Sequence, residues 1–448
     1  MCCGRSVPWL GAGFNHSTDA QFRSLAFQAL NPALRSSLRT DCLGAVMADE
    51  AVIVPARTSL LSIWLVFLRL GLTSFGGPVA HLAYFRQAFV TRRRWLDEPS
   101  YIDLVALCQF LPGPASSQVG FAIGLSQRGL AGGLVAWLGF TLPSAFALTG
   151  LALAARSLGG PMTDQVVHGL KLAAVAIVAQ AVWGMARPLA ADFRRVLIGL
   201  TALGLVLAFS GVLGQYAAIG LGAGLGLILC RHIPPRQASH LSFRVSSRVG
   251  TAALAAFILF LIGLPMAVAM THDRALAVFD GFYRSGALVF GGGHVVLPML
   301  KAAVMDPGWV STNDFLSGYG AAQAMPGPLF TVAAYLGAVM NAPPNGLIGA
   351  LVAVVAIFLP GLLILLGVLP FWDRFRTQAK AQAVMLGVNA AVVGLLTAAL
   401  IDPVWTGAVN SWRDALIAIA GFLAVTFAKA PAWSLVLIFA LGSVLLAG

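Results

Sequence analysis

Charged residues are scarce in this chain of 448 residues: they make up 10%, whereas a soluble domain carries about 25%. Hydrophobic residues make up 59%, which excludes an ordinary soluble domain. The five cysteines show no C-x-x-C or histidine-paired spacing, so neither a metal site nor a disulfide framework is supported. Walker, dinucleotide, zincin and Ser-His-Asp patterns are also missing. We therefore expect no cofactor, no metal and no ATP-driven step, and an ion gradient or the membrane potential as the energy source.

The few charges are strongly unbalanced, with a formal net charge of +12. In a soluble protein this excess would suggest a nucleic-acid partner. Here the basic residues sit in short loops between apolar runs, as the positive-inside rule expects of cytoplasmic loops. The partner predicted from the charge pattern is the lipid bilayer, and no nucleic acid.

Long apolar runs are abundant beyond residue 58, many of them near the roughly 20 residues that a bilayer-spanning helix needs. The sequence predicts an all-α polytopic membrane protein. Roughly thirteen apolar segments are expected, at 59–83, 100–123, 130–156, 165–187, 194–210, 212–230, 249–270, 280–300, 314–340, 344–369, 382–401, 411–428 and 432–447.

Residues 1–58 differ from the rest, being polar, mixed in charge and without strong periodicity. They lack the basic-then-apolar build of a signal peptide. The stretch from Met47, "MADEAVIVPARTSLLSIW", looks like a bacterial start followed directly by a membrane helix. We expect residues 1–58 to be a disordered tail or part of an over-called start.

The chain contains an internal repeat. "FLRLGLTSFGG" from Phe67 matches "FYRSGALVFGG" from Phe282 at six of eleven positions, at a shift of 215 residues. Both halves then carry Gln-x-x-Pro-Gly-Pro, in "QFLPGPASSQVGF" and "QAMPGPLFTVAAY", at a shift of 214. Chance matches of apolar residues would not hold register over such a length. The predicted division is a tail at 1–58, one repeat at 59–230, a basic linker with an extra helix at 231–279, and a second repeat at 280–448.

The two repeats are predicted to be inverted in the membrane. An odd number of segments separates equivalent points, and equivalent loops differ in positive charge, as inverted repeats require. The loop with Arg92, Arg93 and Arg94 falls on the wrong side in a simple count. If the segments carrying Phe-Gly-Gly and Pro-Gly-Pro are instead re-entrant, this loop returns to the cytoplasmic side and the inversion survives.

The two Pro-Gly-Pro elements are the main candidates for a binding site. Proline and glycine should end one half-helix and begin another, and the new N-terminus offers amide hydrogens and a partial positive charge to an anion. Paired breaks in corresponding positions typically mark a transporter's site. The alternative is that each element merely kinks a packed helix. The candidates are Gln109, Pro112, Gly113, Pro114 and Ser116, and in the second repeat Gln323, Pro326, Gly327, Pro328 and Thr331.

A second pair of breaks is predicted at the Phe-Gly-Gly motifs, with Gly76 and Gly77 in one repeat and Gly291, Gly292 and His294 in the other. Close helix packing through small residues is the alternative reading. Arg69 and Arg284 precede these motifs at equivalent positions. An arginine within a spanning segment usually faces a cavity or a partner, and its guanidinium suits an oxyanion. Snorkelling toward the interface is the alternative.

Proton coupling needs a titratable group at membrane depth. Asp103 and Asp280 are the carboxylates closest to it, and His81 and His294 adjoin the glycine motifs and could titrate near neutral pH. For each histidine alone, a structural hydrogen bond is the alternative.

The blocks "FGGPVAHLAYFRQAFVTRRRWLDE", "QFLPGPASSQVGFAIG", "FGGGHVVLPML" and "QAMPGPLFTVAAYLG" resemble the signatures of the chromate ion transporter family, in its long form with two fused homologous halves. The resemblance runs from about Thr58 to the C-terminus. It implies antiparallel halves and a bacterial inner-membrane protein that exports chromate, a tetrahedral dianion similar to sulfate, using the membrane's energy gradient. The positions carried over by motif are Arg69, Gly76, Gly77, Gln109, Pro112, Gly113, Pro114, Arg284, Gly291, Gly292, His294, Gln323, Pro326, Gly327 and Pro328.

Two alternatives remain open. A transporter of sulfate or another oxyanion would show the same features, because tetrahedral dianions present nearly the same hydrogen-bonding surface. A membrane-embedded chromate reductase would need a redox site or a reactive cysteine, and only Cys108 lies near the motifs. The sequence also leaves open a homodimer.

Overall fold

The computed structural model describes residues 58–157, 161–189, 192–209, 211–230, 245–290, 293–372 and 378–446. Most of the predicted tail, the basic residues 231–244 of the predicted linker, and Gly291 and Gly292 lie outside the described residues. Across the described ranges every regular element is a helix. The prediction of an all-α fold is confirmed.

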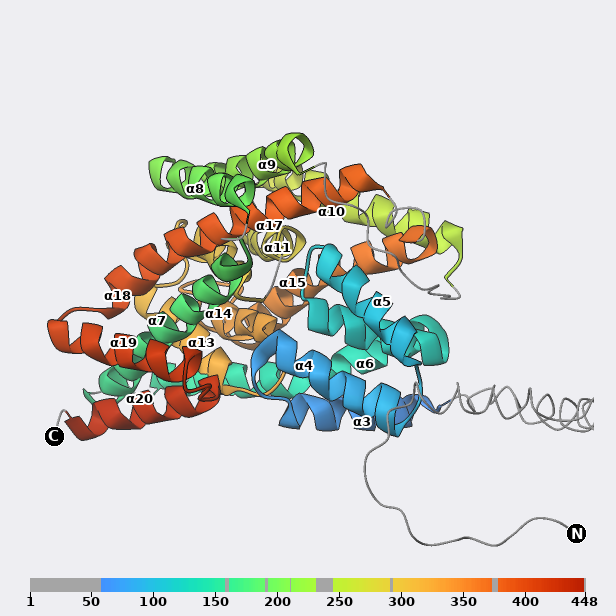
Figure 1. The fold of residues 1–448 in the computed structure, drawn as a ribbon. Helices are drawn as coiled ribbons and strands as arrows, with labels where there is room; N and C mark the ends of the chain where they lie inside the picture. The colour runs from blue at the N-terminus through green and yellow to red at the C-terminus, as the bar shows by residue number, and fades with distance from the viewer. Residues whose placement is uncertain are drawn as a thin grey trace, which may run out of the picture. The chain divides into compact units, whose positions relative to one another are not determined.

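The first repeat and the linker helix supply the elements coloured blue to yellow-green in Figure 1. Their bounds are α3 (Leu60–Thr73), α4 (Gly77–Phe85), the π-helical η1 (Arg86–Arg92), α5 (Glu98–Phe110), α6 (Ala115–Ser157, interrupted at Arg128 and Gly129), α7 (Pro161–Leu189), α8 (Phe193–Ala208), α9 (Val212–Leu229) and α10 (Ser247–Thr271).

The second repeat supplies the elements coloured yellow to red. They are α11 (Arg274–Ala287), η2 (Gly293–Val295), α12 (Val296–Leu300), the π-helical η3 (Lys301–Met305), α13 (Thr312–Ala324), η4 (Leu329–Thr331), α14 (Val332–Val339), α15 (Gly346–Val368), η5 (Leu369–Phe371), α17 (Ala379–Ala399), the π-helical η6 (Leu400–Trp405), α18 (Thr406–Ala408), α19 (Trp412–Thr426) and α20 (Ala432–Leu446).

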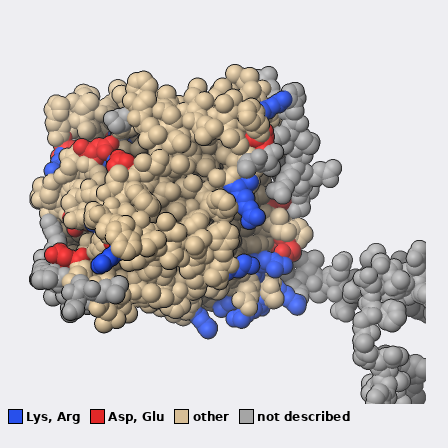
Figure 2. Space-filling model, turned by 60° about the vertical axis from the view of Figure 1, so that its left-hand side comes forward, with Lys and Arg blue, Asp and Glu red and all other residues tan. Residues whose placement is uncertain are grey.

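Five of the described helices are long and apolar enough to cross a membrane, and several shorter helices are equally apolar. The count of roughly thirteen apolar segments is therefore not confirmed as a count of spans. α10 shows the surface expected of a lipid-facing helix, since Leu259 and Met266 are 69% and 61% exposed. Figure 2 shows a broad uncharged face, with Lys and Arg gathered at its lower right edge.

The outer helices of each repeat pack on one helix of the other repeat. α8 and α9 pack against α17, whereas α19 and α20 pack against α7, and the two pairs lie on opposite sides of the bundle (Figure 1). Glycines permit this close approach: Gly222 lies against Gly387 and Ala391, and Gly421 lies against Ala176. Such an exchange is the packing expected of two halves related by a pseudo-two-fold axis.

Each repeat begins with two helical hairpins. In the first hairpin α3 lies beside α4 and η1, with the Phe67 ring 4.9 Å from that of Phe89. In the second, α5 and the first part of α6 return to the same end, where Arg128 Nε donates to Thr58 O at 2.9 Å. The second repeat closes in the same way: Arg274 Nη2 donates to Asn341 Oδ1 at 2.8 Å, and Asn341 Nδ2 donates to Gly308 O at 2.7 Å.

These hairpin arms are too short to cross a bilayer. α3 and α11 have 14 residues and α5 and α13 have 13, against the roughly 20 that crossing needs. Within each repeat the arms begin at the same end, and polar residues cap them there: Asp97 accepts from Ser100 N in the first repeat, and Ser311 accepts from Asp314 N in the second. The hairpins have the geometry of re-entrant segments, which returns the loop with Arg92–Arg94 to the end where α3 begins.

Candidate functional site

The motifs of the first repeat lie at the tips of its two hairpins. α3 ends at Thr73, and Gly76 and Gly77 turn the chain with φ values of 99° and 74° before α4 begins. Pro112, Gly113 and Pro114 turn the chain between α5 and α6. Both motifs break the helix, as predicted. Pro78 and Pro114 lie beside the start of the next helix, where a missing N–H costs least.

The tips of the two repeats cross. Gly113 N–H donates to Val289 O at 2.7 Å, so the first Pro-Gly-Pro is bonded to the second repeat just before its Phe-Gly-Gly motif. In return, Gly327 N–H donates to Ser74 O at 3.0 Å. Ser74 and Val289 are equivalent residues, 215 apart, as Gly113 and Gly327 are at 214. Each Pro-Gly-Pro thus docks on the opposite repeat, and the two bonds form one reciprocal junction, called here the crossed tips.

Only glycine fits at the two central positions. Gly113 has φ of 117°, and a Cβ there would lie 2.9 Å from Gly361 Cα. Gly327 has φ of 102°, and its Cβ would lie 2.8 Å from Ser144 Oγ. Ser144 and Gly361 are again equivalent, each following the proline of its repeat's long helix. A side chain at either position would meet the other repeat, at the Gly361 backbone for Gly113 and at the Ser144 side chain for Gly327. The broken backbone is tolerated here because it is buried in protein.

Two polar side chains of the first repeat support the crossed tips. His81, fully buried, has Nε2 3.2 Å from Ser74 O and Nδ1 3.3 Å from Ser116 Oγ, so it ties the two tips of its own repeat together. Gln118 Nε2 donates at 2.9 Å to both Pro112 O and Gly361 O. Gln118 thereby joins the first Pro-Gly-Pro turn to α15 of the other repeat through two buried backbone carbonyls.

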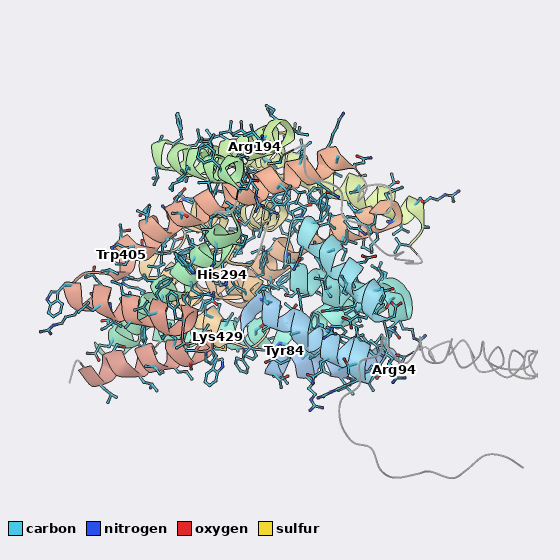
Figure 3. All side chains as sticks on the ribbon, in the orientation of Figure 1. Tyr84, Arg94, Arg194, His294, Trp405 and Lys429 are labelled. Atoms are coloured by element: carbon cyan, nitrogen blue, oxygen red, sulfur yellow. The ribbon has the colours of Figure 1, made fainter. Side chains whose placement is uncertain are left out.

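The second repeat uses different residues at its tips. His294 Nδ1 lies 2.8 Å from the Tyr319 hydroxyl. Thr331 Oγ1 donates to Pro328 O at 2.6 Å. His294 is half-buried and lies near the centre of the view in Figure 3, whereas Arg94 is exposed and lies at its edge. Each of the two histidines therefore makes the structural contact that the alternative reading expected. A role in proton coupling stays a prediction.

Several buried polar atoms near the tips have no hydrogen-bond partner among the described residues. They are Ser74 Oγ, Ser117 Oγ, Gln118 Oε1, Thr141 Oγ1 and Gln323 Nε2. A buried group without a partner costs about 1–3 kcal/mol, so such a concentration calls for an explanation. Four of the five belong to side chains that carry donors free to point at an oxyanion: three hydroxyls and the Gln323 amide.

The remaining predicted residues do not gather at the crossed tips. The side chains of Arg69 and Gln109 are exposed, and Arg69 forms no ion pair among the described residues. Together with burial, the charge of Arg69 lowers the pKa of Arg93, which places it near the basic loop. Asp103 is buried on α5 and engaged in an interaction there.

Arg284 and Asp280 come together in a separate cavity of about 210 Å³. They form an ion pair one helical turn apart on α11, between Arg284 Nη2 and Asp280 Oδ2. The cavity also contains Gln215 and Tyr216 from α9, and Arg284 stands over the Tyr216 ring at 5.9 Å. We call it the Arg284 cavity.

Ser74, Gln118, Ser144 and Gly361 were missed from the sequence. Ser74 and Gln118 lie within or beside the quoted motifs, but their counterparts Val289 and Val332 are apolar, so the repeat comparison gave no signal for them. Ser144 and Gly361 directly follow Pro143 and Pro360 at equivalent positions, which could have marked them.

A bundle of apolar helices with paired, buried breaks in two repeats defines a polytopic membrane protein of the transporter class. The chain belongs to the chromate transporter family: the family model described as "Chromate transporter" matches residues 61–272 and 276–446. This confirms the resemblance and the two-repeat organisation. No solved structure matches the chain.

Curated relatives agree with the family. The chain is 29% identical to "Chromate transport protein" of Pseudomonas aeruginosa, over 78% of this chain and 82% of that protein. It is 28% identical to "Probable chromate transport protein" of Synechococcus elongatus, over 79% and 87%, and 28% identical to "Chromate transport protein" of Cupriavidus metallidurans, over 77% and 82%.

Proposed function

We propose that this protein is a secondary transporter that exports chromate across the bacterial inner membrane, driven by the membrane gradient, and so confers chromate resistance. Its family and the names of its relatives support chromate as the substrate. The observation that carries the proposal is the junction of the crossed tips, where four helix breaks from two repeats meet among unpartnered hydroxyl and amide groups.

The chemistry at the crossed tips suits a dianion. The first amides of a helix have no acceptor within the helix, and the helix N-terminus carries a partial positive charge. α4 and α6 both begin at the tips. A Cβ on Gly77 would meet nothing within 4 Å, so there is open space beside the start of α4. Serine hydroxyls at Ser74 and Ser117 would complete the shell of donors around the oxyanion.

Inverted membrane vesicles test the proposal. Vesicles containing the protein should take up labelled chromate when energised, and a protonophore should stop the uptake. Right-side-out vesicles should not accumulate it. Uptake in neither kind of vesicle would overturn the proposal, while conversion of chromate by the purified protein without a gradient would favour the reductase alternative. An excess of sulfate that abolishes chromate uptake would identify a general oxyanion transporter.

A serine pair on α6 tests the position of the site. Ser117→Ala removes an unpartnered hydroxyl at the crossed tips and should raise the KM for chromate about tenfold, the effect of losing one charge-assisted hydrogen bond. Ser126→Ala is the matched control, since the Ser126 hydroxyl donates to Ile123 O near the far end of the same hairpin arm. Equal KM values for the two variants would remove Ser117 from the site.

A further inference from the structure

The Arg284 cavity lies between α9, α10 and the first hairpin of the second repeat. Its volume of about 210 Å³ far exceeds what one water needs. Asp280 and Arg284 enter it from α11, Gln215 and Tyr216 from α9, and Trp309 from the loop before α13. Most other lining residues are apolar, so the cavity has an apolar lining apart from the wall formed by Asp280 and Arg284.

The ion pair between Asp280 and Arg284 has one hydrogen bond where two are possible. A carboxylate and a guanidinium can join through two parallel bonds, but here only Arg284 Nη2 and Asp280 Oδ2 are joined. Asp280 Oδ1 and Arg284 Nε have no partner among the described residues, although the Asp280 residue is 2% exposed. Gln215 donates to Pro298 O at 2.9 Å while its own Oε1 has no partner there. The guanidinium therefore keeps a donor edge for a second acceptor.

We propose that the Arg284 cavity is a second anion site, in which Arg284 exchanges the Asp280 carboxylate for a tetrahedral oxyanion dianion while Asp280 takes up a proton. An ionised Asp280 and a dianion would repel each other across one guanidinium. One proton from solution must therefore settle on Asp280 for each anion bound, which leaves Arg284 for the ligand. The ligand class rests on the proposed transport of an oxyanion.

The charged surroundings are compatible with this exchange. α9 presents Tyr216, whose ring lies 5.9 Å from the Arg284 guanidinium, and α11 presents Arg284 itself. The faces of α10, α12 and η3 that line the cavity present Val268, Met299, Ala302 and Ala303, which carry no charge. Arg274 stacks on the Trp309 ring at 5.4 Å and is held by Asn341. Asp280 is thus the one carboxylate of the lining residues that competes for Arg284.

The first repeat cannot form the same site. Leu65 stands where the second repeat has Asp280, and Arg69, the counterpart of Arg284, is exposed. The exchange would therefore occur once per chain, and it would give a pair of otherwise similar repeats one proton-linked member.

Binding of labelled sulfate to the purified full-length protein, at pH 6 and pH 8, tests the proposal, because sulfate stays a dianion throughout. Wild type should bind more tightly at pH 6 and take up about one proton per anion in weak buffer. Asp280→Asn should bind about tenfold more tightly than wild type at pH 8 and lose the pH dependence, as expected if the carboxylate occupies Arg284 some nine-tenths of the time. Arg284→Gln should lose the pH-dependent binding, and Arg284→Lys should keep the pH dependence with weaker affinity.

Asp402→Asn is the matched control, because it removes a carboxylate from the Lys301 ion pair outside the cavity and should leave sulfate binding as in wild type. The proposal is overturned if Asp280→Asn keeps wild-type affinity and pH dependence, or if wild type binds neither sulfate nor chromate in a pH-dependent way. Chromate uptake into inverted vesicles separates the two hypotheses: pH-dependent binding without any uptake would sink the proposed function alone, and uptake with an unaltered Asp280→Asn profile would sink the exchange alone.

Discussion

The hairpins of the two repeats share motifs and lengths but not surroundings. In the second repeat every residue of α12 is buried, and so is the run Phe315–Ala322 of α13. In the first repeat only His81 and Phe85 of α4 are buried, and one side of α5 is exposed. Val79 is 82% exposed, whereas its counterpart His294 is half-buried and bonded to Tyr319.

The difference comes from what each hairpin packs against. α13 lies against α7, and α12 lies against α17, so the second repeat's hairpins belong to the core of long helices. α4 and α5 pack chiefly against α6 of their own repeat and reach the other repeat through the crossed tips. The first-repeat hairpins would lose less buried surface on moving, and a transporter with inverted repeats needs one such unequal pair in each of its end states.

The largest expected effect is at the glycines where the two repeats meet. Gly113→Ala would force a Cβ against the Gly361 backbone at a positive φ, and should cost about 3 kcal/mol and abolish transport. Gly327→Ala meets the Ser144 hydroxyl, which can rotate, and should cost less. Thermal unfolding in detergent measures both. Ser144→Ala should partly rescue Gly327→Ala, and equal defects without rescue would show that the contacts do not differ.

The next effect concerns a side chain that only the first repeat has. Gln118→Leu would remove the side-chain donor that joins Pro112 O to Gly361 O, and should lower stability by about 2 kcal/mol. Gln109→Leu is the comparison on the exposed side of α5 and should change stability by less than about 0.5 kcal/mol. Similar unfolding midpoints for the two variants would contradict the bridging role of Gln118.

Cysteine labelling measures the unequal exposure directly. In a cysteine-free background, Val79→Cys should react with a water-soluble thiol reagent about tenfold faster than His294→Cys, because accessibility limits thiol reactivity. Equal rates would mean that these two equivalent positions are exposed alike. A rate for Val79→Cys that falls when chromate is added would place that residue beside the bound anion.

The smallest effect is expected at the surface ion pairs. Arg86 and Lys301 are equivalent residues that open the π-helical turns η1 and η3, and they pair with Glu98 and Asp402. Lys301→Gln should change stability by under about 1 kcal/mol, since Asp402 is 58% exposed. Arg86→Gln should change it less, because the Arg86 side chain is 58% exposed whereas that of Lys301 is 25% exposed. Unfolding midpoints in low and high salt measure both, and a large salt-independent loss would contradict this ranking.

The sequence was sufficient for the fold class, the repeats and the breaks, because these depend on local composition and on register. It also pointed to re-entrant hairpins, through the single misplaced loop at Arg92–Arg94. The crossing itself could not be predicted: Gly113 binds Val289 through a backbone carbonyl, which leaves no side-chain signature. The Arg284 cavity could not be predicted from the sequence for a similar reason, since Tyr216 and Gln215 come from α9 of the other repeat and belong to no motif.

The π-helical turns η1 and η3 bear on the order in which the chain's features arose. A π-helical turn holds its i→i+5 bonds by accommodating an extra residue in a helix. Of the three π-helical turns among the described residues, η1 begins at Arg86 and η3 at Lys301, at the shift of 215 residues that also aligns the Phe-Gly-Gly motifs. An extra residue inherited at the same place by both copies must have been present before they separated. The irregularity is therefore older than the gene duplication, and any ancestor with a single copy already carried it.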